Sequence, residues 1–165
     1  MNPVDQLSLQ PDELVLLNEL VPLSGQRIIE LGCGNARLAR SLLQRFPASH
    51  VTGLEVDAIQ HAKNLEQPQA GLDFLSAGAQ DIPFPAASFD LVLMLKSLHH
   101  VPLPLLPQAL SEAARVLKPG GHLYVSEPIY DGELNEVLRL FNDEGVGRAA
   151  AQAALNEAQA ATGQW

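Results

Sequence analysis

Two kinds of segment alternate along this chain, and their alternation limits the folds open to it. Short β-branched and apolar runs predict strands at residues 27–31, 50–55, 72–75, 89–95 and 122–126. Segments with apolar residues every three to four positions predict helices at residues 11–21, 36–46, 58–65 and 105–117. Short connections and the nearly continuous apolar run at 89–95 favour a buried parallel sheet with helices on both faces. We therefore expect an α/β fold, a three-layer αβα sandwich with a mainly parallel sheet.

The 165 residues fit one domain, because no repeat or linker divides them. Beyond residue 131 the pattern predicts two helices separated near Gly145 and Gly147, the second at residues 148–161. No strand pattern follows Ser126. We expect a single domain over residues 1–165 with a helical C-terminal segment at residues 131–165.

Composition argues against several classes of protein. The net charge is −9, and the ten basic residues are scattered without the basic stripe that nucleic-acid binding needs. The apolar run at residues 91–98 contains Lys96 and is much shorter than the stretch of about 20 residues in a membrane span. The acidic N-terminus differs from a signal peptide, and the single cysteine, Cys33, fits a reducing compartment. We expect a cytoplasmic protein with no membrane span and no nucleic-acid partner.

Glycines and acids follow the first two predicted strands. Gly32 and Gly34 form a Gly-x-Gly turn that lets the backbone approach a ligand, although plain structural turns share this pattern. A dinucleotide fingerprint needs glycine or alanine where Arg37 stands, which disfavours a nicotinamide-dependent oxidoreductase, as does the lack of a Tyr-x-x-x-Lys pair. Glu55 closes the second strand, where a carboxylate can accept hydrogen bonds from ribose hydroxyls or simply lie in solvent. Together these residues indicate a nucleoside-binding site.

Five motifs in order resemble one known family: IIELGCGNARLA, VTGLEVD, DIPFPAASFDLVLML, LHHV and LSEAARVLKPGGHLYVSEP. They are similar to the class I S-adenosylmethionine-dependent methyltransferases of the small-molecule type, a group that includes the ubiquinone and menaquinone methyltransferases. The core motifs cover residues 26–128. The resemblance implies a Rossmann-like fold, S-adenosylmethionine as cofactor and methyl transfer to a small-molecule acceptor.

The resemblance also implies which residues hold the methionine part of the cofactor. Glu30 organises its amino-acid end, and Gly32 and Gly34 line the methionine and ribose with bare backbone. The carbonyl of Leu95 meets the methionine amino group.

For the nucleoside part, the resemblance implies a second group of residues. Glu55 bonds the ribose hydroxyls, and Val56 packs on an adenine face. Ala79 and Gln80 contact adenine with backbone amides and side chains.

Three departures from the family pattern affect these expectations. Ala36 replaces a third glycine, so that its methyl group could narrow the pocket. Gly78 replaces an aspartate that binds the adenine amino group, and Gln80 or Asp81 could compensate. The strand pair that ends the family's sheet is missing, which leaves an uncovered sheet edge. The chain is then either a shortened form of a longer protein or a homodimer through that edge or the C-terminal helices.

No catalytic constellation stands out, so the catalytic residues stay unassigned. His99 and His100 close the fourth predicted strand on the substrate side, as a polar pair or with one of them acting as a base. The other histidines fall on different predicted elements, so we expect no metal site. Cys33 lies in the glycine loop, where its backbone matters more than its thiol.

The predicted function is therefore S-adenosylmethionine-dependent methyl transfer to a small molecule. The alternative is a non-catalytic or truncated module of the same fold that binds the cofactor or a protein partner.

Overall fold

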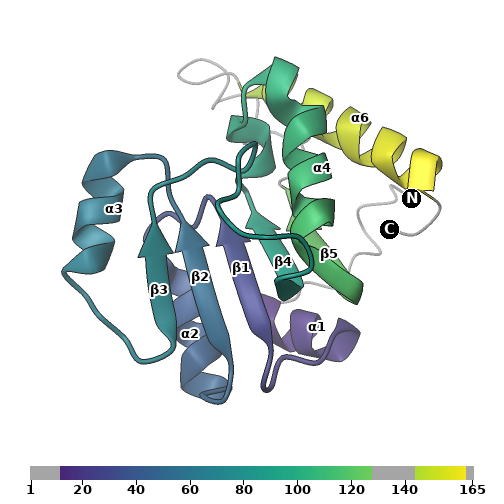
Figure 1. Cartoon of the computed structure of the whole chain (residues 1–165). Helices are drawn as coiled ribbons and strands as arrows, with labels where there is room; N and C mark the ends of the chain where they lie inside the picture. Colours follow the sequence, from purple (N-terminus) through teal and green to yellow (C-terminus); the bar gives the residue numbers. More distant parts are fainter. Residues whose placement is uncertain (1–11, 128–143, 163–165) are drawn as a thin grey trace, which may run out of the picture.

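The computed structural model describes residues 12–127 and 144–162, and in them a five-stranded parallel sheet forms the centre (Figure 1). The strand order is β3-β2-β1-β4-β5. The strands are β1 (Arg27–Leu31), β2 (His50–Leu54), β3 (Leu72–Leu75), β4 (Phe89–Leu95) and β5 (Leu117–Ser126). The sheet confirms the predicted Rossmann-like α/β class.

Helices flank the sheet, and two of them begin at an aspartate that caps the helix. They are α1 (Glu13–Leu20), α2 (Arg37–Arg45), α3 (Ala58–Leu65), α4 (Leu106–Val116) and α6 (Gly145–Thr162), with 3₁₀ turns η2 (Leu98–His100) and η3 (Leu103–Leu105). Asp12 caps α1 by accepting from the Leu14 amide, and Asp57 caps α3 by accepting from the amides of Ile59 and Gln60.

Two apolar cores cover the two faces of the sheet, which makes the fold three layers. Ile28 and Leu91 point to the core shared with α1 and α2, whereas the next residues along the same strands, Ile29 and Val92, point to the core shared with α4 and α6. Successive side chains of a strand face opposite sides, so the central strands β1 and β4 have to be apolar on both sides. This is why the residues of β4 form a nearly continuous apolar run.

The C-terminal third differs from the prediction in two places. The turn at Lys118–Gly121 lies inside β5: Phe89 pairs with Leu117 and Leu91 with His122, so four residues of β5 bulge between the two pairs. Helix α6 begins at Gly145, three residues before the predicted start, and Gly147 lies within it. The first predicted helix of the tail falls largely in residues 128–143, outside the described residues.

The order of the strands decides where a ligand can bind. The chain moves outward from β1 to β2 and β3 and then crosses back to β4 on the other side of β1. The connections that leave β1 and β4 therefore diverge, and such a switch point at the carboxyl ends of parallel strands opens a crevice. Among the helices described here, none is long and apolar enough to cross a membrane.

Candidate functional site

A cavity of about 710 Å³ opens at this switch point, at the carboxyl ends of β1, β2 and β4. All eight residues predicted for the cofactor site line it: Glu30, Gly32, Gly34, Glu55, Val56, Ala79, Gln80 and Leu95. They come from three strand ends and from the loop after β3. The tertiary structure therefore gathers residues that the sequence spreads over 66 positions.

The glycine loop fits tightly against the segment that follows β4. Gly32 has φ +68°, and a Cβ placed on it would lie 2.8 Å from the Cβ of Ser97. Ser97 is buried, and its hydroxyl donates to the Leu31 carbonyl over 2.7 Å. Only a residue without a side chain leaves both this contact and the cavity floor open. Ser97 was not predicted, and only its polarity beside an apolar strand could have indicated it.

Glu55 holds the glycine loop in place from the end of β2. One carboxylate oxygen accepts from the Gly34 amide over 2.8 Å, and the other accepts from the Asp57 amide over 2.9 Å. Asn64 of α3 supports the same loop from outside the cavity, donating to the Gly34 carbonyl over 2.7 Å. Each carboxylate oxygen keeps a second lone pair, so Glu55 retains the capacity to accept from a ligand.

Glu30 is a buried acid at the end of β1, and burial raises its pKa to about 8. Its Oε2 atom has no hydrogen-bond partner among the residues that the structure describes. An unpartnered buried oxygen costs free energy unless a ligand satisfies it. Because Glu30 lines the cavity, a cationic or hydrogen-bond-donating ligand group could do so.

The expected effect of Ala36 on the pocket is wrong. Ala36 is fully buried, packs in the core shared with α1 and α2, and does not line the cavity. Its backbone has φ 56° and ψ 30° at the start of α2. The third glycine of the family pattern therefore corresponds to a left-handed backbone position, which alanine adopts at a cost of about 1 kcal/mol.

The loop after β3 forms the wall of the cavity opposite the glycine loop. A Cβ on Gly78 would lie 2.5 Å from the side-chain amide of Gln80, so Gln80 fills the space of the absent aspartate side chain. Gln80 lines the cavity and Asp81 does not, which favours Gln80 as the compensating residue. Val56, also in the wall, leaves 69% of its surface exposed and offers an apolar face to a ligand.

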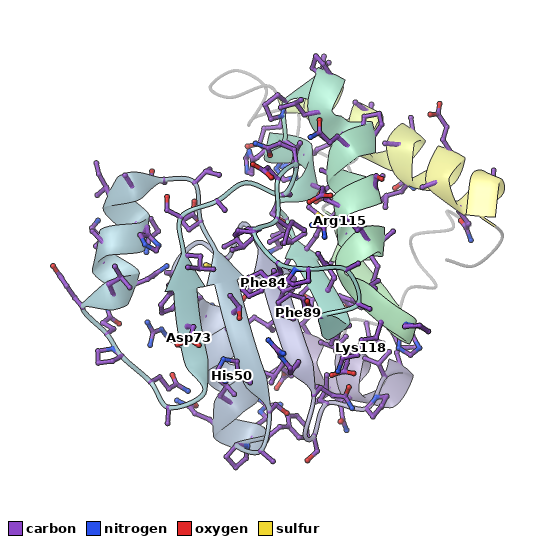
Figure 2. All side chains as sticks on the ribbon, viewed as in Figure 1. His50, Asp73, Phe84, Phe89, Arg115 and Lys118 are labelled. Atoms are coloured by element: carbon purple, nitrogen blue, oxygen red, sulfur yellow. The ribbon has the colours of Figure 1, made fainter. Side chains whose placement is uncertain are left out.

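Helix α4 fixes this loop through two residues that sequence reasoning missed. Arg115 donates to the carbonyls of Phe84 and Ile82 over 2.8 and 3.0 Å, and Glu112 accepts from the Ile82 amide over 3.0 Å (Figure 2). The Phe84 ring meets Phe89 edge to face with centroids 4.9 Å apart. The loop that carries Ala79 and Gln80 is thereby attached to the rigid part of the fold.

His99 and His100 lie in η2, four and five residues beyond the end of β4, and their surroundings differ. His99 is buried and forms ion-pair contacts with Glu127 through Nδ1 and with Glu144 through Nε2, the second over 3.6 Å. His100 is exposed and lines the cavity, with its ring centroid 4.0 Å from that of His99. Only His100 therefore reaches a bound ligand.

The same cluster brings together groups that could hold a metal. Potential ligand atoms of His99, His100 and Glu144 lie within 4.8 Å of one another. Glu144, however, accepts from Arg148 over 2.6 Å, which lowers the pKa of its carboxyl, and the other ring nitrogen of His99 meets Glu127. With a guanidinium already on the carboxylate, the arrangement fits an ion-pair network that attaches α6 to η2.

Cys33 is unsuited to act as a nucleophile. Burial, together with the negative charges of Glu30 and Glu55, raises the pKa of its thiol to about 12. The thiol therefore stays protonated at neutral pH, in agreement with the expectation that the backbone of the loop matters more.

The parallel sheet, the glycine cradle and the acids at the ends of β1 and β2 are typical of α/β domains that bind nucleosides. The chain belongs to the methyltransferase domain family, whose description is "Methyltransferase domain" and whose pattern matches residues 29–125.

Curated relatives agree with this family. The chain is 39% identical over 111 residues to a fatty-acid O-methyltransferase of Mycolicibacterium smegmatis, a match covering 65% of this chain and 39% of that protein. It is 32% identical over 124 residues to a ubiquinone biosynthesis O-methyltransferase of Marinobacter nauticus, covering 72% and 50%. The match thus spans half or less of the length of these relatives.

Solved structures share the fold. An S-adenosylmethionine-dependent methyltransferase from Aquifex aeolicus superimposes with a TM-score of 0.66 at 20% identity, covering 87% of this chain and 78% of that one. The [4+2]-cyclase SpnF superimposes with a TM-score of 0.62 at 30% identity, covering 68% and 43%. Because one of these neighbours is named a cyclase, the fold alone does not fix the reaction.

Proposed function

We propose that this chain binds S-adenosylmethionine in the switch-point cavity and transfers its methyl group to a small-molecule acceptor. The observation that carries the proposal is the pairing of the Gly32 cradle with the unpartnered Glu30 oxygen in one cavity. A buried carboxyl oxygen without a partner among the described residues suits a ligand that carries an amino group. A backbone without a side chain at Gly32 suits a ligand that packs closely against the loop.

The residues present fit this cofactor. Glu30 and the carbonyl of Leu95 would hold the methionine end, and Gly32 and Gly34 would face the ribose. Glu55, Val56, Ala79 and Gln80 would hold the nucleoside. When bound, the cofactor supplies a methyl group on a positively charged sulfur, already activated for displacement.

The chain's own contribution is then to position the reactants. The glycine loop, Glu55 and Ser97 are connected by hydrogen bonds and close contacts, so the floor of the cavity is held at several points. Holding an acceptor in line with the methyl carbon can account for several kcal/mol of the barrier. This explains why the cavity needs no acid–base pair unless the acceptor must lose a proton.

Calorimetric titration with S-adenosylmethionine and with S-adenosylhomocysteine tests the proposal. We expect micromolar binding of both, followed by methyl transfer when small acceptors are added. Absence of binding by a demonstrably folded chain would overturn it. Binding without turnover over a wide acceptor screen would favour the non-catalytic alternative.

Glu55→Ala examines the assigned ribose contact. We expect cofactor affinity to fall by about 1–3 kcal/mol, because charge-assisted hydrogen bonds are lost. Glu55 also supports the Gly34 amide, so Asn64→Ala is the matched control: it loosens the same loop from outside the cavity. Equal losses of affinity in the two variants would assign Glu55 to the loop alone.

Location and assembly are proposed from separate observations. The single cysteine fits the reducing cytoplasm, which we propose as the location of the protein.

In the described residues β5 is the last strand of the sheet and pairs only with β4, so we propose a homodimer through this edge or through the C-terminal helices. A concentration-independent monomer in sedimentation velocity would contradict the dimer.

A further inference from the structure

Charge is unevenly distributed around the cavity. The ends of β1 and β2 contribute two acids, Glu30 and Glu55. The segment after β4 contributes the two side chains that can carry positive charge, Lys96 and His100. A ligand that fills the whole cavity therefore meets carboxyl groups at one side and basic groups at the other.

Lys96 is held at this place by its backbone. Its φ is +53°, which is uncommon for a residue with a long side chain, and such conformations concentrate at functional sites. Its amide donates to the Ser126 carbonyl over 2.7 Å, and the next residue, Ser97, is anchored to the Leu31 carbonyl. Two neighbouring strand ends thus impose the left-handed turn.

The Lys96 side chain is exposed and lacks an ion-pair or hydrogen-bond partner among the residues that the structure describes. Of the eight other lysines and arginines in those residues, four form ion pairs: Arg45 with Asp12, Arg115 with Glu112, Lys118 with Asp90 and Arg148 with Glu144. The same cavity is also lined by the apolar residues Ala77, Met94, Val101 and Pro102. A cavity that offers both an ammonium without a described partner and apolar lining residues suits an amphiphilic anion.

We propose that the methyl acceptor is an organic carboxylate with an apolar tail, and that Lys96 binds its carboxylate. This inference rests on the proposed function. A carboxylate oxygen would form the new bond to the methyl carbon while the S–C bond breaks and leaves its electron pair on sulfur. The product is a methyl ester, and no proton has to be removed. That chemistry agrees with a cavity in which the acids are engaged with the loop or buried.

A neutral hydroxyl acceptor requires a further catalytic group. It would need a base to take its proton, and among the cavity-lining residues His100 is the group suited to that task. Variants of Lys96, tested with a charged and a neutral acceptor, therefore separate the two classes of acceptor.

Octanoate and octan-1-ol are matched probes, since they share the tail and differ in charge. Binding of each to the wild-type chain is measured by calorimetry with and without S-adenosylhomocysteine, and methyl octanoate formation is followed with S-adenosylmethionine labelled in its methyl group. We expect octanoate to bind at least tenfold more tightly than octan-1-ol, and to weaken as salt screens the charge.

Lys96→Asn removes the charge while tolerating the left-handed backbone, and Lys96→Arg retains the charge. We expect Lys96→Asn to weaken octanoate binding tenfold or more and to raise the KM for octanoate, with S-adenosylhomocysteine affinity unchanged. Lys96→Arg should keep most of the affinity, because it retains the positive charge.

Three results would overturn the carboxylate proposal: equal binding of the alcohol, unchanged octanoate affinity in Lys96→Asn, or a loss of cofactor affinity in that variant as large as the loss for octanoate. The last would place Lys96 against the methionine carboxylate. If the wild-type chain binds octanoate through Lys96 but does not bind S-adenosylhomocysteine, the proposed function fails and the anion site stands. If the wild-type chain binds S-adenosylhomocysteine but not octanoate, the carboxylate proposal fails and the proposed function stands.

Discussion

At the scale of single residues, the cavity depends on backbone conformations that most side chains oppose. Gly32, Gly34, Ala36 and Lys96 all have positive φ, and all four lie just after β1 or β4. Glycine adopts this conformation freely, whereas alanine and lysine adopt it only where neighbouring contacts enforce it. Of the three described non-glycine residues with positive φ, Ala36, Ala87 and Lys96, only Lys96 lines the cavity, so backbone strain in the cavity wall is confined to this position.

Gly32→Ala should destabilise the fold by about 2–4 kcal/mol, because it adds left-handed strain and a close contact with Ser97. Gly25→Ala is the matched control: its φ is +73°, but nothing lies within 4 Å of the added Cβ, so it should lose only about 1 kcal/mol. Urea unfolding of both variants measures the difference. Equal losses would show that Ser97 does not press on this position.

At the scale of elements, α6 is attached to η2 closely enough to influence the cavity wall. A Cβ on Gly147 would lie 2.7 Å from the His99 carbonyl oxygen. His99 in turn contacts Glu127 after β5 and Glu144 before α6, and Glu127 also accepts from the Leu98 amide over 2.8 Å. The turn that carries His100 is therefore held between β5 and α6.

Gly147→Ala should destabilise the protein by about 1–3 kcal/mol, because the methyl group pushes α6 away from η2. Helix propensity alone predicts the opposite, a gain of up to about 1 kcal/mol. Ala153→Gly, at an exposed position of α6, measures that intrinsic difference in the same helix. A gain in stability for Gly147→Ala, seen in thermal unfolding, would exclude the close contact.

At the scale of the whole molecule, the buried acid Glu30 couples folding to pH. Burial raises its pKa from about 4.5 to about 8, so the folded protein retains a proton that the unfolded chain releases. The contribution of Glu30 to stability is then greatest below pH 4.5 and is lost as the pH rises toward 8, because the stability falls wherever the folded state binds more protons.

Glu30→Gln removes this dependence while keeping the size of the side chain. Relative to wild type, the variant should gain stability steadily between pH 5 and pH 8, by up to about 4 kcal/mol, and gain nothing further above pH 8. Urea unfolding at a series of pH values measures this difference. A difference that does not change with pH would contradict the raised pKa.

The spans of most elements and the outline of the site could be predicted from the sequence. Strand and helix patterns are local, and the apolar runs of β1 and β4 follow directly from burial on both faces. The family resemblance, together with the rule that parallel strands end at one edge, placed the eight residues proposed for the cofactor in what is one cavity of the structure. The irregular turn inside β5 and the early start of α6 depend on pairing with β4 and packing on η2, which local patterns do not contain.

Tertiary structure alone decided which residues support the site. Asn64 reaches Gly34 across 30 positions and Ser97 reaches Leu31 across 66, and neither contact has a local signature. The same holds for the separation of His99 from His100, adjacent residues of which one is buried in an ion-pair network and one faces the cavity. Sequence periodicity records which face of an element is apolar, whereas partners across elements are set only when the layers pack together.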